Sequence, residues 1–143
     1  MAITAQGTTI EISDDGITYV SLGCINSFSI DGNARAEIDV TCLTSTSKEF
    51  MFGLRDNGTM SLEVRYDPSD AGLALANASY ASDVAYQFRI TYNDQITPVT
   101  GTKTISEFDG FVMNLSHGGA VDDVLSGSIE VKLSGDVTTT PAT

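Results

Sequence analysis

The sequence predicts a mainly β domain, a β-sandwich or open barrel of two antiparallel sheets with one flanking α-helix and one long loop between strands. Short segments in which apolar and polar residues alternate recur along the chain, and this period of two is typical of half-buried strands. Clusters of Asp, Asn and Gly separate these segments and favour turns. One segment has helical spacing instead. A length of 143 residues suits a single domain.

Four strands are expected in the first third of the chain, over residues 8–12, 17–20, 25–30 and 34–43. The sequences Asp14-Asp15-Gly16 and Asp31-Gly32-Asn33 predict turns between them. In the fourth strand, an apolar face (Ala36, Ile38, Val40) alternates with a polar face (Arg35, Glu37, Asp39, Thr41).

The stretch EFMFGLRDNGTMSLEV, residues 49–64, combines two patterns. In its second half Met60, Leu62 and Val64 alternate with polar residues, which predicts a strand over residues 59–66. The sequence Asp56-Asn57-Gly58 predicts a turn before that strand. The first half carries four large apolar residues without clean periodicity, and we expect them in a long loop over residues 44–58: Phe50, Met51, Phe52 and Leu54.

The stretch YDPSDAGLALANASYAS predicts the one helix, over residues 68–82. Asp67 is the expected N-cap, and Pro68 suits the first helical position because its φ is already helical. Leu73, Ala76 and Tyr80 form one apolar stripe at helical spacing.

The second half of the chain predicts a strand over residues 86–92, a loop over 93–102 and a closing strand over 125–133. Between the loop and the closing strand, residues 103–108 and 110–115 are two strands or one bent strand. The domain is expected to span residues 1–135, and we expect residues 136–143 to form a flexible tail.

The chain is strongly acidic, with 19 acidic and 7 basic residues and a net charge of −12. Nucleic-acid binding is disfavoured because the chain has no basic cluster that could neutralise phosphates. The acidity serves either solubility or a specific role. The sequence has no apolar run that could span a membrane and no leader pattern, so the expected setting is cytoplasmic.

Catalytic and metal-binding patterns are weak. The one histidine, His117, precedes Gly118-Gly119 and is expected in an exposed turn, without a second ligand or a nucleophile elbow nearby. Cys24 and Cys42 belong to no metal or redox motif, and we expect buried thiols. The sequence therefore predicts no enzyme, no cofactor and no metal site.

The order of the motifs resembles the tail tube (major tail) proteins of long-tailed, siphovirus-type bacteriophages. Three pieces carry the resemblance: Asp39-Val40-Thr41 leading to Lys48-Glu49-Phe50, then Gly53-Leu54-Arg55-Asp56-Asn57-Gly58, then Phe108-Asp109-Gly110-Phe111-Val112 followed by an acidic turn and a final strand that ends at Ser134-Gly135. Their order and spacing together cover nearly the whole chain.

The resemblance implies a structural virion protein that forms hexameric rings, which stack into the hollow tail tube through which DNA passes during ejection. Four strands of each subunit would form the inner wall. Implied partners are other copies of the chain, the tape measure protein, and tail terminator and tip proteins. DNA would pass without specific binding and no membrane is involved. The implied location is the virion tail, after assembly in the host cytoplasm.

The resemblance also implies a role for the long loop, which would contact neighbouring rings through Lys48, Glu49, Phe50, Met51, Phe52, Leu54 and Arg55. The alternative is that this loop covers its own core. Candidate carboxylates for the lumen lie on polar strand faces and in the acidic turn: Glu37, Asp39, Glu63, Glu130, Asp122 and Asp123. A solvated outer face is the alternative for each of them.

Other functions remain open at this point. A type VI secretion tube or a contractile-tail inner tube would share the fold. A stand-alone β-sandwich binding module is disfavoured, because sugar sites use aromatic platforms and the chain has no Trp.

Overall fold

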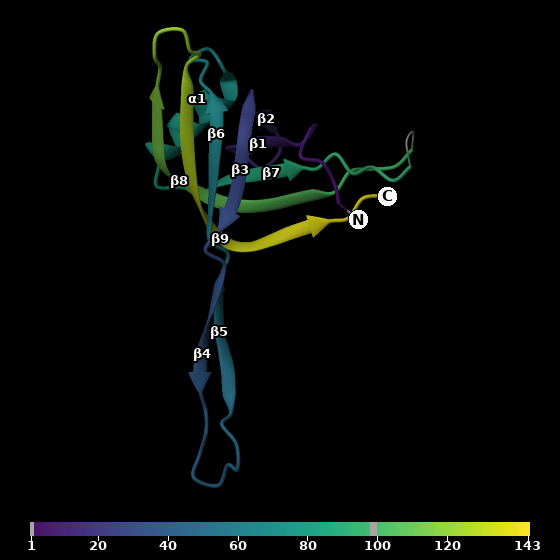
Figure 1. The fold of residues 1–143 in the computed structure, drawn as a ribbon, viewed down its shortest axis with the longest axis vertical. Coiled ribbons are helices and arrows are strands. Elements are labelled where there is room, and N and C mark those ends of the chain that lie inside the picture. Colours follow the sequence, from purple (N-terminus) through teal and green to yellow (C-terminus); the bar gives the residue numbers. More distant parts are fainter. Residues whose placement is uncertain (1, 98–99) are drawn as a thin grey trace.

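The computed structural model describes residues 2–97 and 100–143, so Pro98 and Val99 of the predicted 93–102 loop lie outside the described residues. It confirms a mainly β fold with one short helix (Figure 1). The elements are β1 (Thr9–Ser13), β2 (Val20–Ser21), β3 (Ile25–Asp31), β4 (Ala34–Asp39), β5 (Phe50–Asp56), β6 (Thr59–Arg65), α1 (Ala71–Tyr80), β7 (Tyr86–Thr91), β8 (Ile105–Gly118) and β9 (Ser126–Thr140).

Seven strands form one antiparallel sheet in the order β2-β1-β7-β8-β9-β6-β3. The predicted two layers arise because this sheet curls. The first part of β8 pairs with β7, whereas the first part of β9 pairs with β6. The β8–β9 ladder shifts register between Glu107 and Asp109, opposite Gly135, which has a φ of +77°. Such a bulge bends both strands and lets them serve both layers.

The core lies between the two layers and follows the predicted alternation. Met60, Leu62 and Val64 of β6 are buried, and so are their β9 counterparts Ile129, Val131 and Leu133. The rings of Phe88 and Phe108 stack with centroids 5.7 Å apart. Each fully buried side chain of this kind contributes about 1.5–3 kcal/mol to folding.

The helix begins later than predicted. Asp70, not Asp67, is the N-cap, because its Oδ1 accepts a hydrogen bond from the backbone N–H of Gly72 at 2.9 Å. Asp67 instead accepts bonds from Ser69 in the preceding turn, which contains Pro68. Leu73 and Ala76 are buried as expected, but Tyr80 is 58% exposed, so the stripe covers only the first two turns.

The tail was expected to be flexible, and this prediction is wrong. β9 continues to Thr140, and residues 138–140 pair with residues 105–107 of β8. Thr143 donates its N–H to the Thr102 carbonyl at 2.9 Å and accepts from the backbone N–H of Thr97 at 3.1 Å. The segment is thus hydrogen-bonded to the chain at Thr97 and Thr102. The predicted strand over residues 17–20 is also reduced, to Val20–Ser21.

Candidate assembly interface

About half of the predicted long loop is a strand, which pairs with the preceding one. Residues 50–56 form β5, which pairs with β4, so the expectation of an irregular 44–58 loop is wrong. This pair continues the β3–β6 ladder in register, since Asp31 faces Thr59 and Ala34 faces Asp56. Residues 34–56, here called the arm, form the outer half of one long hairpin that projects from the body (Figure 1).

Two glycines interrupt this hairpin where the arm leaves the body. Gly32, between β3 and β4, faces Gly58, between β5 and β6, and both have a φ of +83°. A Cβ on Gly58 would lie 2.0 Å from the carbonyl oxygen of Asp31. The Asp-Gly-Asn and Asp-Asn-Gly sequences that predicted chain-reversing turns therefore form a joint between two ladders, and the chain reverses only at residues 40–49.

The body holds this joint through β9. The ammonium of Lys132 lies 2.6 Å from the carboxylate of Asp56, and the Asn57 side-chain amide donates to the carbonyl of Gly135 at 2.5 Å. The backbone N–H of Leu133 donates to the Gly58 carbonyl at 3.1 Å. The hydrogen bond from Lys132, followed by that from the Gly58 N–H, lowers the pKa of Asp56 below its usual value of 3.8.

The arm exposes its apolar side chains. Every residue of β4 is exposed, and in β5 only Gly53 is partly covered. Phe50 is 48% exposed and Leu54 is 96% exposed. The guanidinium of Arg35 lies over the Phe52 ring, 5.1 Å from its centroid. The structure thus places the predicted contact residues on the arm: Lys48 and Glu49 at the reversal, and Phe50, Met51, Phe52, Leu54 and Arg55 on β5.

The reversal of the arm carries an exposed thiol. Cys42 and Cys24 are both exposed and free, so the expectation of buried thiols is wrong. Cys42 lies near the hydroxyls of Ser45 and Thr44, with sulfur–oxygen distances of 3.3 and 3.1 Å. These hydrogen bonds lower the pKa of the Cys42 thiol to about 7.

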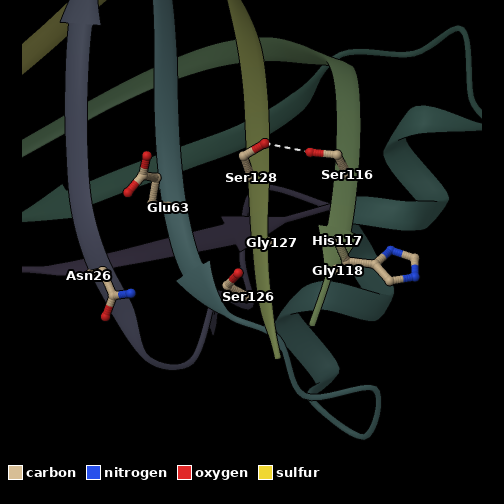
Figure 2. A pocket seen from close by; sticks show the side chains of 8 residues that line it. All are labelled: Asn26, Glu63, Ser116, His117, Gly118, Ser126, Gly127 and Ser128. Atoms are coloured by element: carbon tan, nitrogen blue, oxygen red, sulfur yellow. Dashed lines mark hydrogen bonds between the residues drawn. The ribbon is translucent and has the colours of Figure 1, made fainter. Parts of the chain in front are cut away.

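The outer surface of β3, β6, β9 and the second part of β8 is a polar face, opposite the core. Figure 2 shows one end of this face, a shallow hollow of about 310 Å³ to which four neighbouring strands contribute. Ser116 of β8 and Ser128 of β9 are hydrogen-bonded across it at 2.6 Å. Glu63 lies on β6 beside Ser27 of β3, and Glu130 lies on β9 opposite Ser61. Short hydroxyl side chains with a few carboxylates therefore cover this face along β3, β6 and β9, whereas β8 adds the exposed apolar side chains of Phe111 and Met113.

The predicted acidic residues fall in three places. Glu63 and Glu130 share the polar face. Glu37 and Asp39 are on β4 of the arm, where Thr41 lowers the pKa of Asp39 through its hydroxyl and backbone N–H. Asp122 and Asp123 lie in the turn between β8 and β9.

Two basic residues of the sheet are neutralised locally. Lys132 pairs with Asp56, and Arg89 pairs with Glu11 at 2.5 Å while its guanidinium covers the Tyr19 ring at 4.0 Å. On the polar face itself, Lys132 is therefore neutralised, whereas the exposed Arg65 of β6 shares this face with Glu63 and has no carboxylate within 4.0 Å among the described residues.

Both edges of the four strands with the polar face are open in the described chain. β3 is the last strand in the sheet order. On the other side, β7 pairs with β8 only as far as Gly110, so residues 111–118 of β8 have one strand partner, β9. Open edges of this kind are ready to pair with another chain.

The described residues contain no cluster of three or more metal-ligating side chains, and no described helix is long and apolar enough to cross a membrane. His117 is exposed as predicted but lies at the end of β8, stacked on Tyr66 with centroids 4.5 Å apart.

Sequence reasoning missed Arg35 as a partner of Phe52. The joint could have been found from residues 31–33 (Asp-Gly-Asn) and 56–58 (Asp-Asn-Gly). Both segments lie at about the same distance in sequence from the reversal at residues 40–49, so a hairpin places them opposite each other.

A curled antiparallel sheet with one short helix and a projecting arm defines the tail-tube class of folds. The tail of an empty gene transfer agent (GTA) particle superposes with a TM-score of 0.71 at 17% identity, over 97% of this chain and 99% of that chain. The SPP1 tail tube gives a TM-score of 0.71 at 12% identity, over 98% of this chain and 80% of that one.

The family model "Phage tail tube, TTP, lambda-like" matches residues 1–143, and the chain belongs to this family. A curated relative, "Structural protein 3" of Pseudomonas phage PAJU2, is 26% identical over 94% of this chain and 91% of that protein. The protein is thus a structural component of a phage tail and not an enzyme, which confirms the resemblance seen in the sequence.

Proposed function

We propose that the chain forms hexameric rings that stack into the hollow tail tube through which DNA is ejected, and that the arm joins one ring to the next. The exposed apolar arm is the main support for this proposal. Its side chains are not buried against the body of their own subunit: Phe50, Met51, Phe52 and Leu54. Six arms in each ring would act together, so a modest contact becomes a firm joint by multivalency. The similar GTA tail has C6 symmetry, which supports the ring size.

The four-stranded polar face is the proposed inner wall. Its two open edges, β3 and residues 111–118 of β8, would pair between neighbouring subunits. Six subunits would then give roughly 24 strands, each occupying roughly 6.3 Å of circumference at a tilt of about 40°. The barrel would be roughly 48 Å across at the backbone and roughly 38 Å between side chains, which admits a DNA duplex.

The acidic balance suits this passage. Glu63 and Glu130 lie among serines on the polar face, and Lys132 is neutralised by Asp56. A duplex carries about one negative charge per 1.7 Å of its axis, so a weakly negative wall lets it slide without binding. Glu37 and Asp39 lie on the arm, away from this face, and stay predictions as lumen residues. Asp122 and Asp123 also lie away from it, in the turn between β8 and β9.

The proposed partners are further copies of the chain, the tape measure protein inside the tube, and terminator and tip proteins at its ends. Assembly is proposed to occur in the host cytoplasm. The phage family model favours this function over a type VI secretion tube or a contractile-tail inner tube, which share the fold, and over a stand-alone binding module.

Negative-stain electron microscopy of the purified, concentrated protein tests the proposal. We expect six-fold rings or hollow rods from the natural chain. The double variant Phe50→Asp/Phe52→Asp should fold but form rings without rods. A matched variant, Ile17→Asp/Val84→Asp, changes two exposed apolar residues outside the arm and should still form rods. Long rods from the arm variant would disprove the role of the arm.

A further inference from the structure

The arm and the turn between β8 and β9 lie at opposite ends of the body. The turn, residues 119–125, is here called the β8–β9 tip. Strand β6 joins the two ends, because Thr59 follows the joint of the arm and Arg65 pairs with Ser126, directly after the tip. Figure 1 shows the arm and the tip pointing in opposite directions. They cannot meet within one copy, but two copies placed end to end bring them together.

The base of the arm carries two like charges without a carboxylate partner. Arg35 and Arg55 lie directly opposite each other on β4 and β5. Like charges in this position destabilise a ladder. Among the described residues the ion pairs are Arg89–Glu11 and Lys132–Asp56, so neither arginine has a carboxylate within 4.0 Å. With Lys48, the arm holds three of the seven basic residues of a chain with a net charge of −12.

The β8–β9 tip has the complementary character. Its apolar side chains Val121, Val124 and Leu125 are exposed, and Val121 is 92% exposed. Asp122 and Asp123 lie among them, and residues 119–125 contain no Lys or Arg. On the arm, Arg35 and Arg55 lie opposite each other, and the Arg35 guanidinium lies over the ring of the exposed Phe52. This face of the arm therefore combines an exposed apolar residue with two cations.

We propose that the base of the arm of one copy docks on the β8–β9 tip of a second copy. In this contact Phe52 meets Val121, while Arg35 and Arg55 face Asp122 and Asp123. The inference rests on the proposed stacking and names its receiving surface. It also assigns Asp122 and Asp123 to the junction between rings instead of the lumen.

This arrangement fixes the direction of the stack. Each copy has one arm and one tip at opposite ends, so the contact joins unlike surfaces and generates an open filament. Head-to-head stacking would bring arginine pairs together, and tail-to-tail stacking would bring aspartate pairs together. Both are opposed by like-charge repulsion, so the charges specify a single polarity.

Charge reversal tests the pairing. Arg55→Glu and Asp123→Lys should each shorten the rods at least tenfold and leave rings intact, whereas the double variant Arg55→Glu/Asp123→Lys should restore long rods. The conservative variant Arg55→Lys and the distant variant Asp14→Lys should match the natural chain. Rods that stay short in the double variant, or stay long in both single variants, would overturn the proposed pairing.

Cross-linking separates this inference from the proposed function. The variant Phe52→Cys/Val121→Cys in a Cys24→Ser/Cys42→Ser background should give a ladder of multimers on a reducing gel after treatment with a short bismaleimide. The control variant Phe52→Cys/Ile17→Cys in the same background should give no ladder. Rods without a ladder would overturn the docking surface alone, for example because the arm contacts a neighbour in its own ring. A ladder without rods would support the contact and count against the tube, and the absence of both would overturn both.

Discussion

Gly32 and Gly58 face each other at the joint between the β3–β6 ladder and the β4–β5 ladder of the arm, and both have a φ of +83°. The two ladders on either side keep the same register, so the glycines change the direction of the hairpin without changing its pairing. The arm therefore continues β3 and β6 and is not a separate module.

The variant Gly58→Ala tests this joint. A Cβ would lie 2.0 Å from the Asp31 carbonyl oxygen, and the left-handed backbone is unfavourable for alanine. We expect a loss of more than about 1 kcal/mol in the free energy of unfolding, measured by urea denaturation. Gly118→Ala is the control, because a Cβ there has nothing within 4 Å. Equal unfolding free energies of the two variants would mean that a Cβ at position 58 fits the joint without strain, which would contradict this prediction.

The Lys132–Asp56 pair should respond to pH. The folded-state pKa of Asp56 is lowered, so the pair stabilises the joint above the unfolded value near 3.8 and loses this effect as pH falls through the folded pKa. An NMR titration of the Asp56 carboxyl should therefore give a midpoint below 3.8, and Lys132→Met should move it upward. Both groups are exposed, so we expect little change in Tm. An unchanged midpoint in Lys132→Met would refute the pairing in solution.

Cys42 should be the more reactive thiol at neutral pH. Its pKa of about 7, compared with an ordinary thiol value of 9.0, makes about half of it thiolate at pH 7. Maleimide labelling should modify Cys42 before Cys24, and Ser45→Ala should slow the labelling of Cys42 because it removes the hydrogen bond that lowers this pKa most. If the arm reverses against a neighbouring ring, labelling in assembled rods should slow at Cys42. Equal rates in subunits and rods would argue that the reversal stays in solvent.

Leu62 and Leu54 offer a matched pair of the same residue type. Leu62 is 1% exposed in the core, whereas Leu54 is 96% exposed on the arm. Leu62→Ala should cost about 2–5 kcal/mol of unfolding free energy, and Leu54→Ala should stay within about 0.5 kcal/mol. Denaturation of the unassembled subunit measures both. A large cost for Leu54→Ala would mean that the arm packs on its own body, as in the alternative raised by the sequence.

The strands with clean alternation were predictable, because burial of one face imposes a period of two. Met60, Leu62 and Val64, and Ile129, Val131 and Leu133, lie in the core for this reason. The pairing of β5 was not predictable from that signal, because both faces of the arm are exposed and no core selects one of them. The tail was misjudged for a related reason, since Thr138, Thr139 and Thr140 are held by the β8 ladder and not by apolar burial.

The candidate surfaces were predictable in part. The apolar residues of the arm stood out because solvent-exposed loops seldom carry so many. The helix start was placed three residues early, because Asp67 and Asp70 both suit an N-cap and only the contact with Gly72 distinguishes them. The position of Arg35 directly opposite Arg55 depends on the strand register at the joint. This register cannot be read from a single sequence.

The register shared by arm and wall has a mechanical consequence. A pull on the arm would be transmitted into β3 and β6 along their own length. The hydrogen bonds between antiparallel strands lie perpendicular to that direction. The seven residue pairs between β6 and β9 would therefore bear the load together, in shear, instead of opening one after another. In the proposed tube, tension along the tail would therefore be resisted within the sheet of each subunit and not only at the contacts between rings.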